Sequence, residues 1–251
     1  MKAQSDESKI VIVCALKEEC AAVEAGLSPE FRDRFELIRA GVGSISAARV
    51  AKELAAREHP PEMIVSTGFC GGLADDLKVG DVVVGSEIMG TQEPLPAPSE
   101  IDSFTTRRNA GGGLEQFVCE VLHRQGIKPY LARMICTEDA VVTSEQKRAL
   151  AKDFCVQAVD MESHALVSNS DSAHTRVIFM RTVSDTVNDE LPAEVGEFLN
   201  EQGNVRLGKI TRFVLKKPSN IKRLMELKKR SDIAANSLTQ AWRAIRDMSF
   251  E

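Results

Sequence analysis

The sequence has no long hydrophobic run. None of its apolar segments approaches the ~20 residues that a membrane-spanning helix needs. The opening residues, MKAQSDES, are polar and lack the apolar centre of a secretory signal peptide. We therefore expect a cytoplasmic protein in which residues 1–8 form a flexible N-terminus.

Paired cysteines and clustered histidines are also lacking. The six cysteines contain no C-x-x-C pair, and several lie in apolar runs, which is typical of reduced thiols in a protein core. The histidines His123, His164 and His174 show no metal-ligand spacing. The segment Gly41-Val42-Gly43 begins a G-x-G pattern, but position 46 is Ser46, so the dinucleotide-binding fingerprint fails. We expect no metal and no cofactor.

Positive charge is in deficit over the whole chain. Lys and Arg number 32 against 37 Asp and Glu, which gives a formal net charge of −5. A protein that neutralises phosphates needs a basic surface, so nucleic acid is not expected as a partner. The exception is the segment 206–230, where basic residues recur at helical spacing beside apolar ones. This segment is either an amphipathic helix packed on its own domain or a membrane-binding surface.

Short β-branched runs alternate with helical segments along most of the chain. Hydrophobic residues make up 43% of the 251 residues, which is enough for a large core. Buried strands are expected over residues 9–16, 36–40, 63–67, 81–89, 131–136, 156–159 and 176–183. Helices are expected over 17–26, 44–58, 114–125 and 144–152, and a further helix begins with residues 161–170; Gly26 is the expected C-cap and Ser144 the expected N-cap.

This alternation predicts an α/β fold. We expect a single domain over residues 1–251, with a central mixed, mainly parallel twisted sheet flanked by helices. Residues 193–251 are expected to form a helical C-terminal tail. Glycines at 68–72 predict a turn after a strand, and the prolines and glycines of 90–113 predict a long surface loop that could serve as a lid.

Polar residues follow four of the expected strands. The segments are Ala15–Glu19, Ser66–Gly72, Asp160-Met161-Glu162 and Ser184-Asp185. Ligands of parallel sheets bind at the carboxyl ends of the strands, so we expect these segments to form one site. Each segment also has a purely structural interpretation, namely a solvated glutamate, a tight turn, a helix cap and a strand-ending turn.

Three segments, read in order, carry a family resemblance: STGFCGGLADDLKVGDVVV, AVDMESHAL and RTVSD. Together with the opening VCALKEE, they resemble the purine nucleoside phosphorylase and nucleosidase superfamily, above all its methylthioadenosine/S-adenosylhomocysteine nucleosidase branch. The resemblance extends from about Lys9 to Asp185. It implies an enzyme that cleaves the N-glycosidic bond of a purine nucleoside.

The acid and base residues are implied by this resemblance. Asp185 matches the acid that protonates the departing base at N7, and Ser184 matches a residue that orients this acid. Glu19 matches the carboxylate that activates water in the nucleosidases. Phosphorylases carry an arginine before the glycine turn and a serine within it, where this sequence has Ser66 and Phe69. Hydrolysis is therefore favoured, and phosphorolysis is the alternative.

The resemblance also implies a set of substrate-binding residues. Residues 137–142, TEDAVV, occupy the position of the segment whose backbone recognises the base, and valine stands where an aromatic residue usually stacks on the purine. Glu162 matches the carboxylate that binds the ribose hydroxyls, and this charge favours the developing sugar cation. The full set is Glu162, Met161, Gly71, Phe69, Val141 and Val142.

Phe69 departs from the nucleosidases, which carry a small hydroxyl residue at that place. This departure points away from methylthioadenosine itself and toward an adenosine with another 5′ substituent. One candidate is a branch associated with hopanoid biosynthesis, whose substrate carries a large lipid on the 5′ carbon. The 90–113 loop and the basic tail, which differ from the small nucleosidases, agree with this candidate.

The partners implied are a purine nucleoside and either water or phosphate. Members of the superfamily assemble as dimers, trimers or hexamers, so we expect a homo-oligomer, with a dimer favoured. The alternative of another class is a non-catalytic nucleoside-binding protein on the same fold. The presence of both Glu162 and Asp185 argues against it, because binding alone requires no acid.

Overall fold

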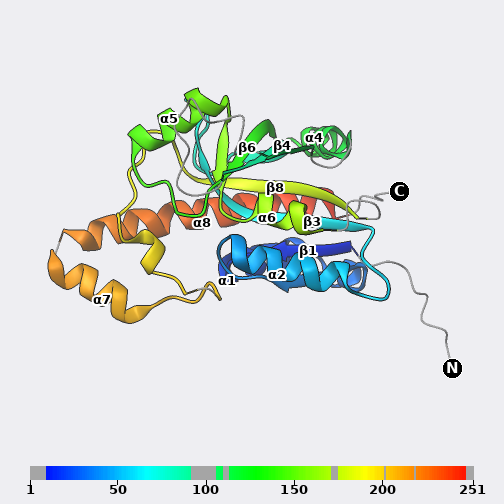
Figure 1. The fold of residues 1–251 in the computed structure, drawn as a ribbon, viewed down its shortest axis with the longest axis horizontal. Coiled ribbons are helices and arrows are strands. Elements are labelled where there is room, and N and C mark those ends of the chain that lie inside the picture. The colour runs from blue at the N-terminus through cyan, green and yellow to red at the C-terminus, as the bar shows by residue number, and fades with distance from the viewer. Residues whose placement is uncertain are drawn as a thin grey trace.

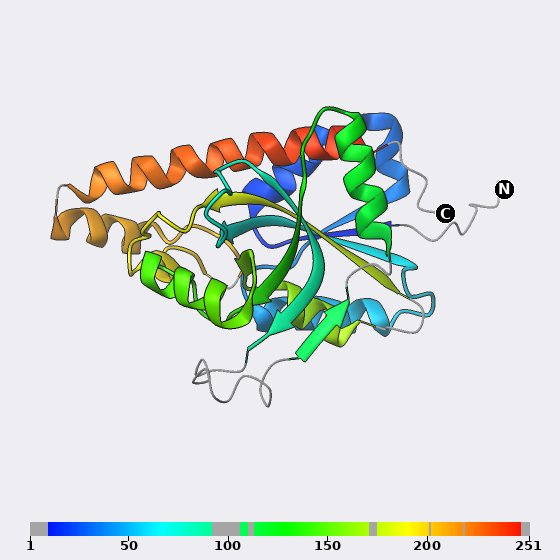
Figure 2. The ribbon, with the colours of Figure 1, turned by 90° about the horizontal axis from the view of Figure 1, so that it is seen from above.

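The computed structural model describes residues 10–91, 106–109, 113–170, 175–200, 202–217 and 219–246. Its centre is an eight-stranded sheet (Figures 1 and 2). The strands are β1 (Ile10–Cys14), β2 (Phe35–Arg39), β3 (Met63–Gly72), β4 (Val82–Gly90), β5 (Thr106–Asn109), β6 (Tyr130–Cys136), β7 (Ala158–Asp160) and β8 (Arg176–Asp185).

The strand pairing confirms a mixed, mainly parallel sheet. β1 runs parallel to β2 and β3, β3 to β8, β4 to β6, and β6 to β7. The antiparallel pairs are β3 with β7, β4 with β5, and β4 with β8. Through these pairings β3, β8, β4, β6 and β7 close into a ring, a feature that the alternation of strands and helices does not predict.

Helices cover both faces of the sheet, as expected for an α/β fold. On one face α2 packs against α6, and on the other α1 and α4 pack against α8. The described α-helices are α1 (Lys17–Gly26), α2 (Ser44–Ala55), α4 (Leu114–Arg124), α5 (Ser144–Phe154), α6 (Ser163–Asn169), α7 (Leu207–Lys216) and α8 (Asn220–Ile245).

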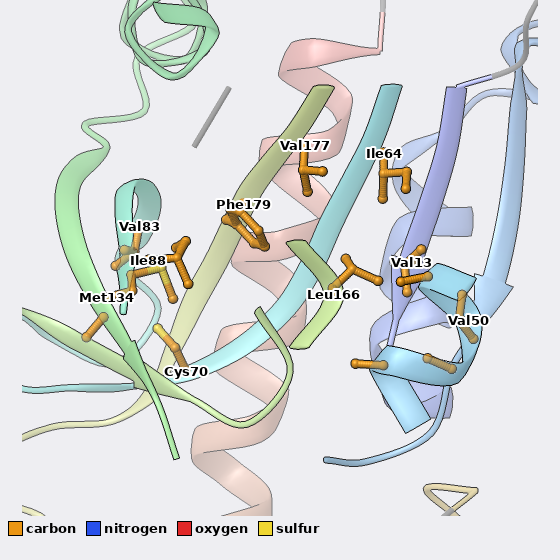
Figure 3. Packing of buried hydrophobic residues seen from close by; sticks show 14 of the residues in the cluster. Val13, Val50, Ile64, Cys70, Val83, Ile88, Met134, Leu166, Val177 and Phe179 are labelled. Carbon is orange, nitrogen blue, oxygen red and sulfur yellow. The ribbon is translucent and has the colours of Figure 1, made fainter. Parts of the chain in front are cut away.

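Strand β1 shows why its sequence is apolar throughout. Successive side chains of a strand point to opposite faces, so a strand covered on both faces needs apolar residues at every position. Val11 and Val13 join the core cluster under α2 and α6, whereas Ile12 and Cys14 join the cluster under α1, α4 and α8. Figure 3 shows the first cluster, in which Val13 lies near Leu166 of α6. Burial on both faces holds the end of β1, and the residues that follow it, in place.

Gly26 is the last residue of α1 and not the C-cap that the sequence predicted, which is Leu27. A Cβ built at Gly26 would lie 2.6 Å from the Cβ of Trp242, a fully buried residue of α8. The glycine therefore allows α8 to approach α1 closely. Trp242 in turn packs edge-on against Phe35, with ring centroids 6.1 Å apart.

The glycine-rich segment 68–72 is the second half of β3 and not a turn. It is held in extended form because its residues pair with β8 along one edge and with β7 along the other. Likewise Ser184 and Asp185, expected just after a strand, are the last two residues of β8.

The N-cap of α5 is Thr143 and not Ser144. The Thr143 hydroxyl accepts the backbone N–H of Gln146 at 3.1 Å, whereas the Ser144 hydroxyl donates to the carbonyl of Val187 at 2.7 Å. Ser144 thus ties the start of α5 to the segment after β8, and this connection becomes important at the candidate site.

The expected surface loop at 90–113 contains a strand, because β5 pairs antiparallel with β4. The lid itself would fall in residues 92–105 and 110–112, which lie outside the described residues, as does the N-terminal segment 1–8.

The tail after residue 193 is helical only in part. The 3₁₀ turn η4 (Val195–Glu197) is followed by a bridge between Leu199 and Val205, and then by α7 and α8. Phe213 of α7 is buried against Phe198, while Leu207 and Leu215 are exposed. No helix in the described part of the chain is long and apolar enough to cross a membrane.

Candidate active site

A hollow lies at the carboxyl end of β1 and beside the middle of β3. This position agrees with the rule that ligands of such sheets bind near the carboxyl ends of strands. Its lining includes apolar residues of β1, α2 and α6. The polar and charged side chains in the lining are Glu19, Ser66, Thr67, Glu162 and Arg181.

Glu19 lies in the first turn of α1, and 3% of it is exposed. Its Oε2 accepts the backbone N–H groups of Ala15 and Leu16 at 2.9 and 2.8 Å, and its Oε1 accepts that of Phe69 at 2.8 Å. The interpretation of Glu19 as a solvated surface residue is therefore wrong. The side chain links the turn after β1 to β3.

The electrostatic surroundings of Glu19 favour a base. Burial raises the pKa of its carboxyl group above the ordinary value, while the three backbone N–H groups and the positive charge of Arg181 act in the opposite direction. A carboxylate that is held by backbone donors and has a raised pKa can accept a proton from a nearby water.

Glu162 reaches the same hollow from the start of α6. It makes no capping hydrogen bond to its own helix, and its Oε1 instead accepts the backbone N–H of Gly43 at 2.7 Å. Burial, followed by the nearby charge of Asp160, raises the pKa of Glu162 to about 7. Glu162 is therefore more than a charge at the end of its helix, because it binds the backbone N–H of Gly43. The Gly41-Val42-Gly43 segment thus joins the site through its backbone.

Arg181 is a buried cation that the sequence analysis did not single out. It lies in the middle of β8, is 2% exposed, and donates from Nε to Asp160 at 3.0 Å. Its second terminal nitrogen donates to the hydroxyls of Ser66 and Ser163 at 2.8 and 2.9 Å. A basic residue inside the apolar run RVIFMRTV was the available signal, because a charge buried in a strand needs a partner.

Asp160 is that partner, and it also binds the first residue of α6. Its two carboxylate oxygens accept the Ser163 hydroxyl and, at 3.3 Å, the Ser163 backbone N–H. The N-cap residue of α6 is Glu162, so the expectation of Asp160 as the N-cap is wrong, although Asp160 binds the first residue of the helix. The same side chain pairs with Arg181, so it orients this arginine of the lining as well as the start of α6.

Asp185 lies at the end of β8 and is 6% exposed. Its Oδ1 accepts the hydroxyl of Ser184 at 2.8 Å, as expected for a residue that orients it. Its Oδ2 lies 2.5 Å from Nζ of Lys147, a residue of α5 that the sequence analysis did not single out. A Cβ at Gly71 would lie 3.3 Å from the same oxygen, so the glycine allows β3 to pass close to the acid.

The remaining predicted residues lie around these two centres. Phe69 lines the hollow, and its ring packs against the core cluster that contains Trp242. Met161 is partly buried between Asp160 and Glu162. Val141 packs against the core cluster beneath α5, and Val142 accepts the backbone N–H of Leu191 at 2.9 Å.

The structure therefore groups the predicted residues in two places. Glu19, Phe69 and Glu162 line the hollow, whereas Ser184 and Asp185 do not. Gly71, paired with both Val159 of β7 and Asp185 of β8, lies on the strand that connects the two places. Within the described residues, no cluster of three or more His, Cys, Asp or Glu side chains could hold a metal ion.

Comparison with known proteins identifies the class to which the chain belongs. The family described as the phosphorylase superfamily matches residues 9–215, so the chain belongs to that superfamily. Membership confirms the expected class of enzyme, a nucleosidase or nucleoside phosphorylase that acts on an N-glycosidic bond.

Individual relatives show which enzymes of the superfamily the chain is similar to. The chain is 25% identical over 172 residues to the 5′-methylthioadenosine/S-adenosylhomocysteine nucleosidase of Shewanella pealeana, which covers 66% of this chain and 74% of that protein. The corresponding enzyme of Neisseria meningitidis, solved with methylthio-immucillin-A, is 19% identical and has a TM-score of 0.67, over 96% of this chain and 100% of that one.

A second kind of hydrolase has a similar structure. The futalosine hydrolase of Helicobacter pylori is 16% identical, with a TM-score of 0.66 over 93% of this chain and 97% of that one. At this identity the likeness shows the fold alone. The fold is thus shared by enzymes whose named substrates carry different groups.

Proposed function

We propose that this protein hydrolyses the N-glycosidic bond of an adenosine-type purine nucleoside that carries a 5′ substituent. The observation that carries the proposal is the position of Glu19. Its buried carboxylate accepts three backbone hydrogen bonds and lines a hollow that it shares with Glu162. With two carboxylates at one hollow, one can activate the nucleophile while the other binds the sugar.

Glu19 acts as the base that activates water. Its carboxylate accepts the backbone N–H groups of Ala15, Leu16 and Phe69. The same residue lines the hollow. A water held there would lose its proton to Glu19 as it attacks C1′ of the sugar. The raised pKa of Glu19 strengthens it as a base.

Glu162 binds the ribose hydroxyls, with Met161 packed against the sugar. One oxygen of Glu162 accepts the Gly43 N–H, which leaves the other oxygen for the ribose. The negative charge stabilises the cation that develops on the sugar as the bond breaks. This function requires the ionised form of Glu162.

Asp185 protonates the base as it leaves. Ser184 holds one oxygen of its carboxyl group, and the close passage of β3 at Gly71 leaves room for it beside the strand. The base lies against residues 137–142, with the side chain of Val141 in place of a stacking aromatic ring. Proton transfer of this kind typically contributes about 10²- to 10⁴-fold to the rate.

The charges in the hollow favour water over phosphate. A phosphate site needs free cationic or backbone donors. Arg181 is the cation in the lining, and its strong hydrogen bonds are made to Asp160, Ser66 and Ser163. Glu19 and Glu162 would repel a phosphate dianion. Hydrolysis is therefore the function that the site supports best.

The test is a substrate screen in buffers with and without phosphate. Methylthioadenosine, S-adenosylhomocysteine, futalosine and adenosines with a long 5′-alkyl group are each incubated with the enzyme, and the base and the sugar product are measured together. We expect equal amounts of free base and free sugar, independent of phosphate. A sugar 1-phosphate would show a phosphorylase, and tight binding without release of base would show a nucleoside-binding protein.

A further inference from the structure

Lys147 is a fully buried cation for which the mechanism above has no use. It lies in the first turn of α5 with 0% of its side chain exposed, and its Nζ is 2.5 Å from Oδ2 of Asp185. Removing a charge from water is costly, so a buried lysine persists only where its partners compensate it. Here the compensating partner is the residue that is proposed to protonate the base.

The contacts of Lys147 specify its charged form. Besides Asp185, Nζ donates to the backbone carbonyls of Thr186 and Asp189, both at 2.9 Å. An ammonium group has three N–H donors, whereas a neutral amine has two donors and a lone pair. Three acceptors therefore match an ammonium ion, with one proton directed at Asp185.

The two carbonyls belong to a turn that is held by side-chain hydrogen bonds. Asp189 Oδ2 accepts both the backbone N–H and the hydroxyl of Thr186, each at 2.8 Å. Ser144, three residues before Lys147, donates to the carbonyl of Val187 in the same turn. Lys147 is therefore fixed from two sides, by its helix and by the turn that follows Asp185.

Lys147 also lies close in sequence to the segment proposed to contact the base. Helix α5 begins directly after residues 137–142, and Val142 is bonded to Leu191 just beyond the turn. A base bound against residues 137–142 would thus adjoin the helix that carries Lys147. The lysine, the acid and the base-binding segment form one connected unit.

We propose that Lys147 is a positioning residue that holds Asp185 toward the purine and supplies the proton that Asp185 delivers. This inference rests on the proposed function, because it assigns the source of the proton in that reaction. It explains how a carboxylate that is already paired with a cation can act as an acid, since the pair holds one transferable proton on the lysine.

The proton balance of this step is complete. As the bond between C1′ and N9 breaks, its electron pair passes to the purine. Lys147 transfers a proton to Oδ2 of Asp185, and the carboxyl group so formed protonates N7, which leaves a neutral amine and a carboxylate. The attacking water bonds to C1′ and gives its proton to Glu19. After the products leave, exchange with solvent returns the proton from Glu19 to Lys147.

The experiment compares two leaving groups in wild type and in Lys147→Met. A 5′-substituted adenosine needs a proton at N7, whereas the nitrophenolate of a 4-nitrophenyl β-D-riboside leaves as a stable anion and needs none. We expect K147M to lower kcat by about 10²-fold on the adenosine, and by at most about threefold on the nitrophenyl riboside. Equal losses on both substrates would overturn the inference, because a merely structural role makes no distinction between leaving groups.

A double variant keeps the test valid if K147M folds poorly. K147M leaves Asp185 buried without a cation, whereas K147M/D185N replaces the ion pair by neutral side chains of similar size. Since Lys147 acts through Asp185, we expect D185N and K147M/D185N to release base at the same rate. A further drop of tenfold or more in the double variant would overturn the inference.

The matched control is Lys152→Met on the exposed side of the same helix. We expect K152M to equal wild type on both substrates. Wild-type enzyme that releases no base from any purine nucleoside would refute the proposed function itself. The outcomes that concern Lys147 are ratios between variants of an active enzyme, so the two failures are distinguishable.

Discussion

Gly68 and Glu19 are in direct contact, and the carboxylate of Glu19 occupies the space that a side chain at position 68 would need. A Cβ built on Gly68 would lie 2.5 Å from Oε1 of Glu19 and 2.6 Å from its Cδ. Both residues line the hollow, and the next N–H along β3, that of Phe69, donates to the same carboxylate. The glycine of β3 and the glutamate of α1 thus form one structural unit.

Substitution of Gly68 by alanine is therefore expected to displace the Glu19 carboxylate. We expect G68A to lower kcat by about 10²-fold, since a shift of about 1 Å in a positioned group can cost this much. The crowding should also lower the free energy of unfolding by about 1–3 kcal/mol. Steady-state kinetics and denaturant unfolding measure the two effects. The control is Gly208→Ala, because a Cβ there meets nothing within 4 Å; equal behaviour of the two variants would contradict the contact.

Substitution of Gly26 tests the packing of the helices and not the candidate site. The Cβ of an alanine at this position would lie 2.6 Å from the Cβ of Trp242. We expect G26A to separate α1 from α8 and to lower the free energy of unfolding by about 1–3 kcal/mol. Activity per folded molecule should change little, because neither residue lines the hollow. Unchanged stability would show that the two helices do not pack as described.

Glu162 is expected to make stability depend on pH. Its pKa in the folded protein is raised from 4.5 to about 7. Between these values the folded state holds the proton more tightly than the unfolded state, so the free energy of unfolding falls as the pH rises through this window. Glu162→Gln removes this contribution. We expect E162Q to match wild type below pH 4.5 and to be more stable above pH 7 by up to about 3 kcal/mol. Parallel unfolding curves of the two proteins from pH 4 to 8 would argue against the raised pKa.

The same titration is expected to appear in the kinetics. Because the ionised form of Glu162 accepts the ribose hydroxyls, kcat/KM should rise as the pH increases through about 7. E162Q should lose about 10²-fold in kcat/KM and should no longer show this rise. The measurement is a pH profile of both proteins on one nucleoside. An identical pH dependence in E162Q would assign the titration to another group.

Asp185 and Ser184 are expected to differ in the size of their effects. Asp185→Asn removes the acid, so kcat per folded molecule on a purine nucleoside should fall by about 10²- to 10⁴-fold. Ser184→Ala removes one of the two side-chain donors to the carboxyl group, and Lys147 still holds the other oxygen. We expect a loss of at most about tenfold in S184A. Full activity in D185N would refute the assignment of the acid.

The strands and the position of the site were predictable because local patterns determine them. Runs such as that of β1 are apolar at every position because the strand is covered on both faces, and such strands place their ligands at the carboxyl end. Glu19 and Glu162 were found by this rule together with the family resemblance. Both line the hollow in the structure.

The features that were missed depend on contacts between distant segments. The glycines of 68–72 indicate a turn locally, but pairing with β7 and β8 holds them in a strand. Arg181 stands in an apolar run that indicates burial, but neither its neighbouring sequence nor that of Lys147 shows which aspartate lies beside it. The partners, Asp160 and Asp185, lie 21 and 38 residues away along the chain.

The most direct test of the account follows oxygen from solvent into the sugar. The enzyme cleaves a 5′-substituted adenosine in ¹⁸O-labelled water that contains phosphate, and the mass of the sugar product is measured. We expect free sugar that carries one ¹⁸O atom at C1′, together with an equal amount of free base. A sugar 1-phosphate would contradict this expectation, because phosphate and not the water activated by Glu19 would then be the nucleophile.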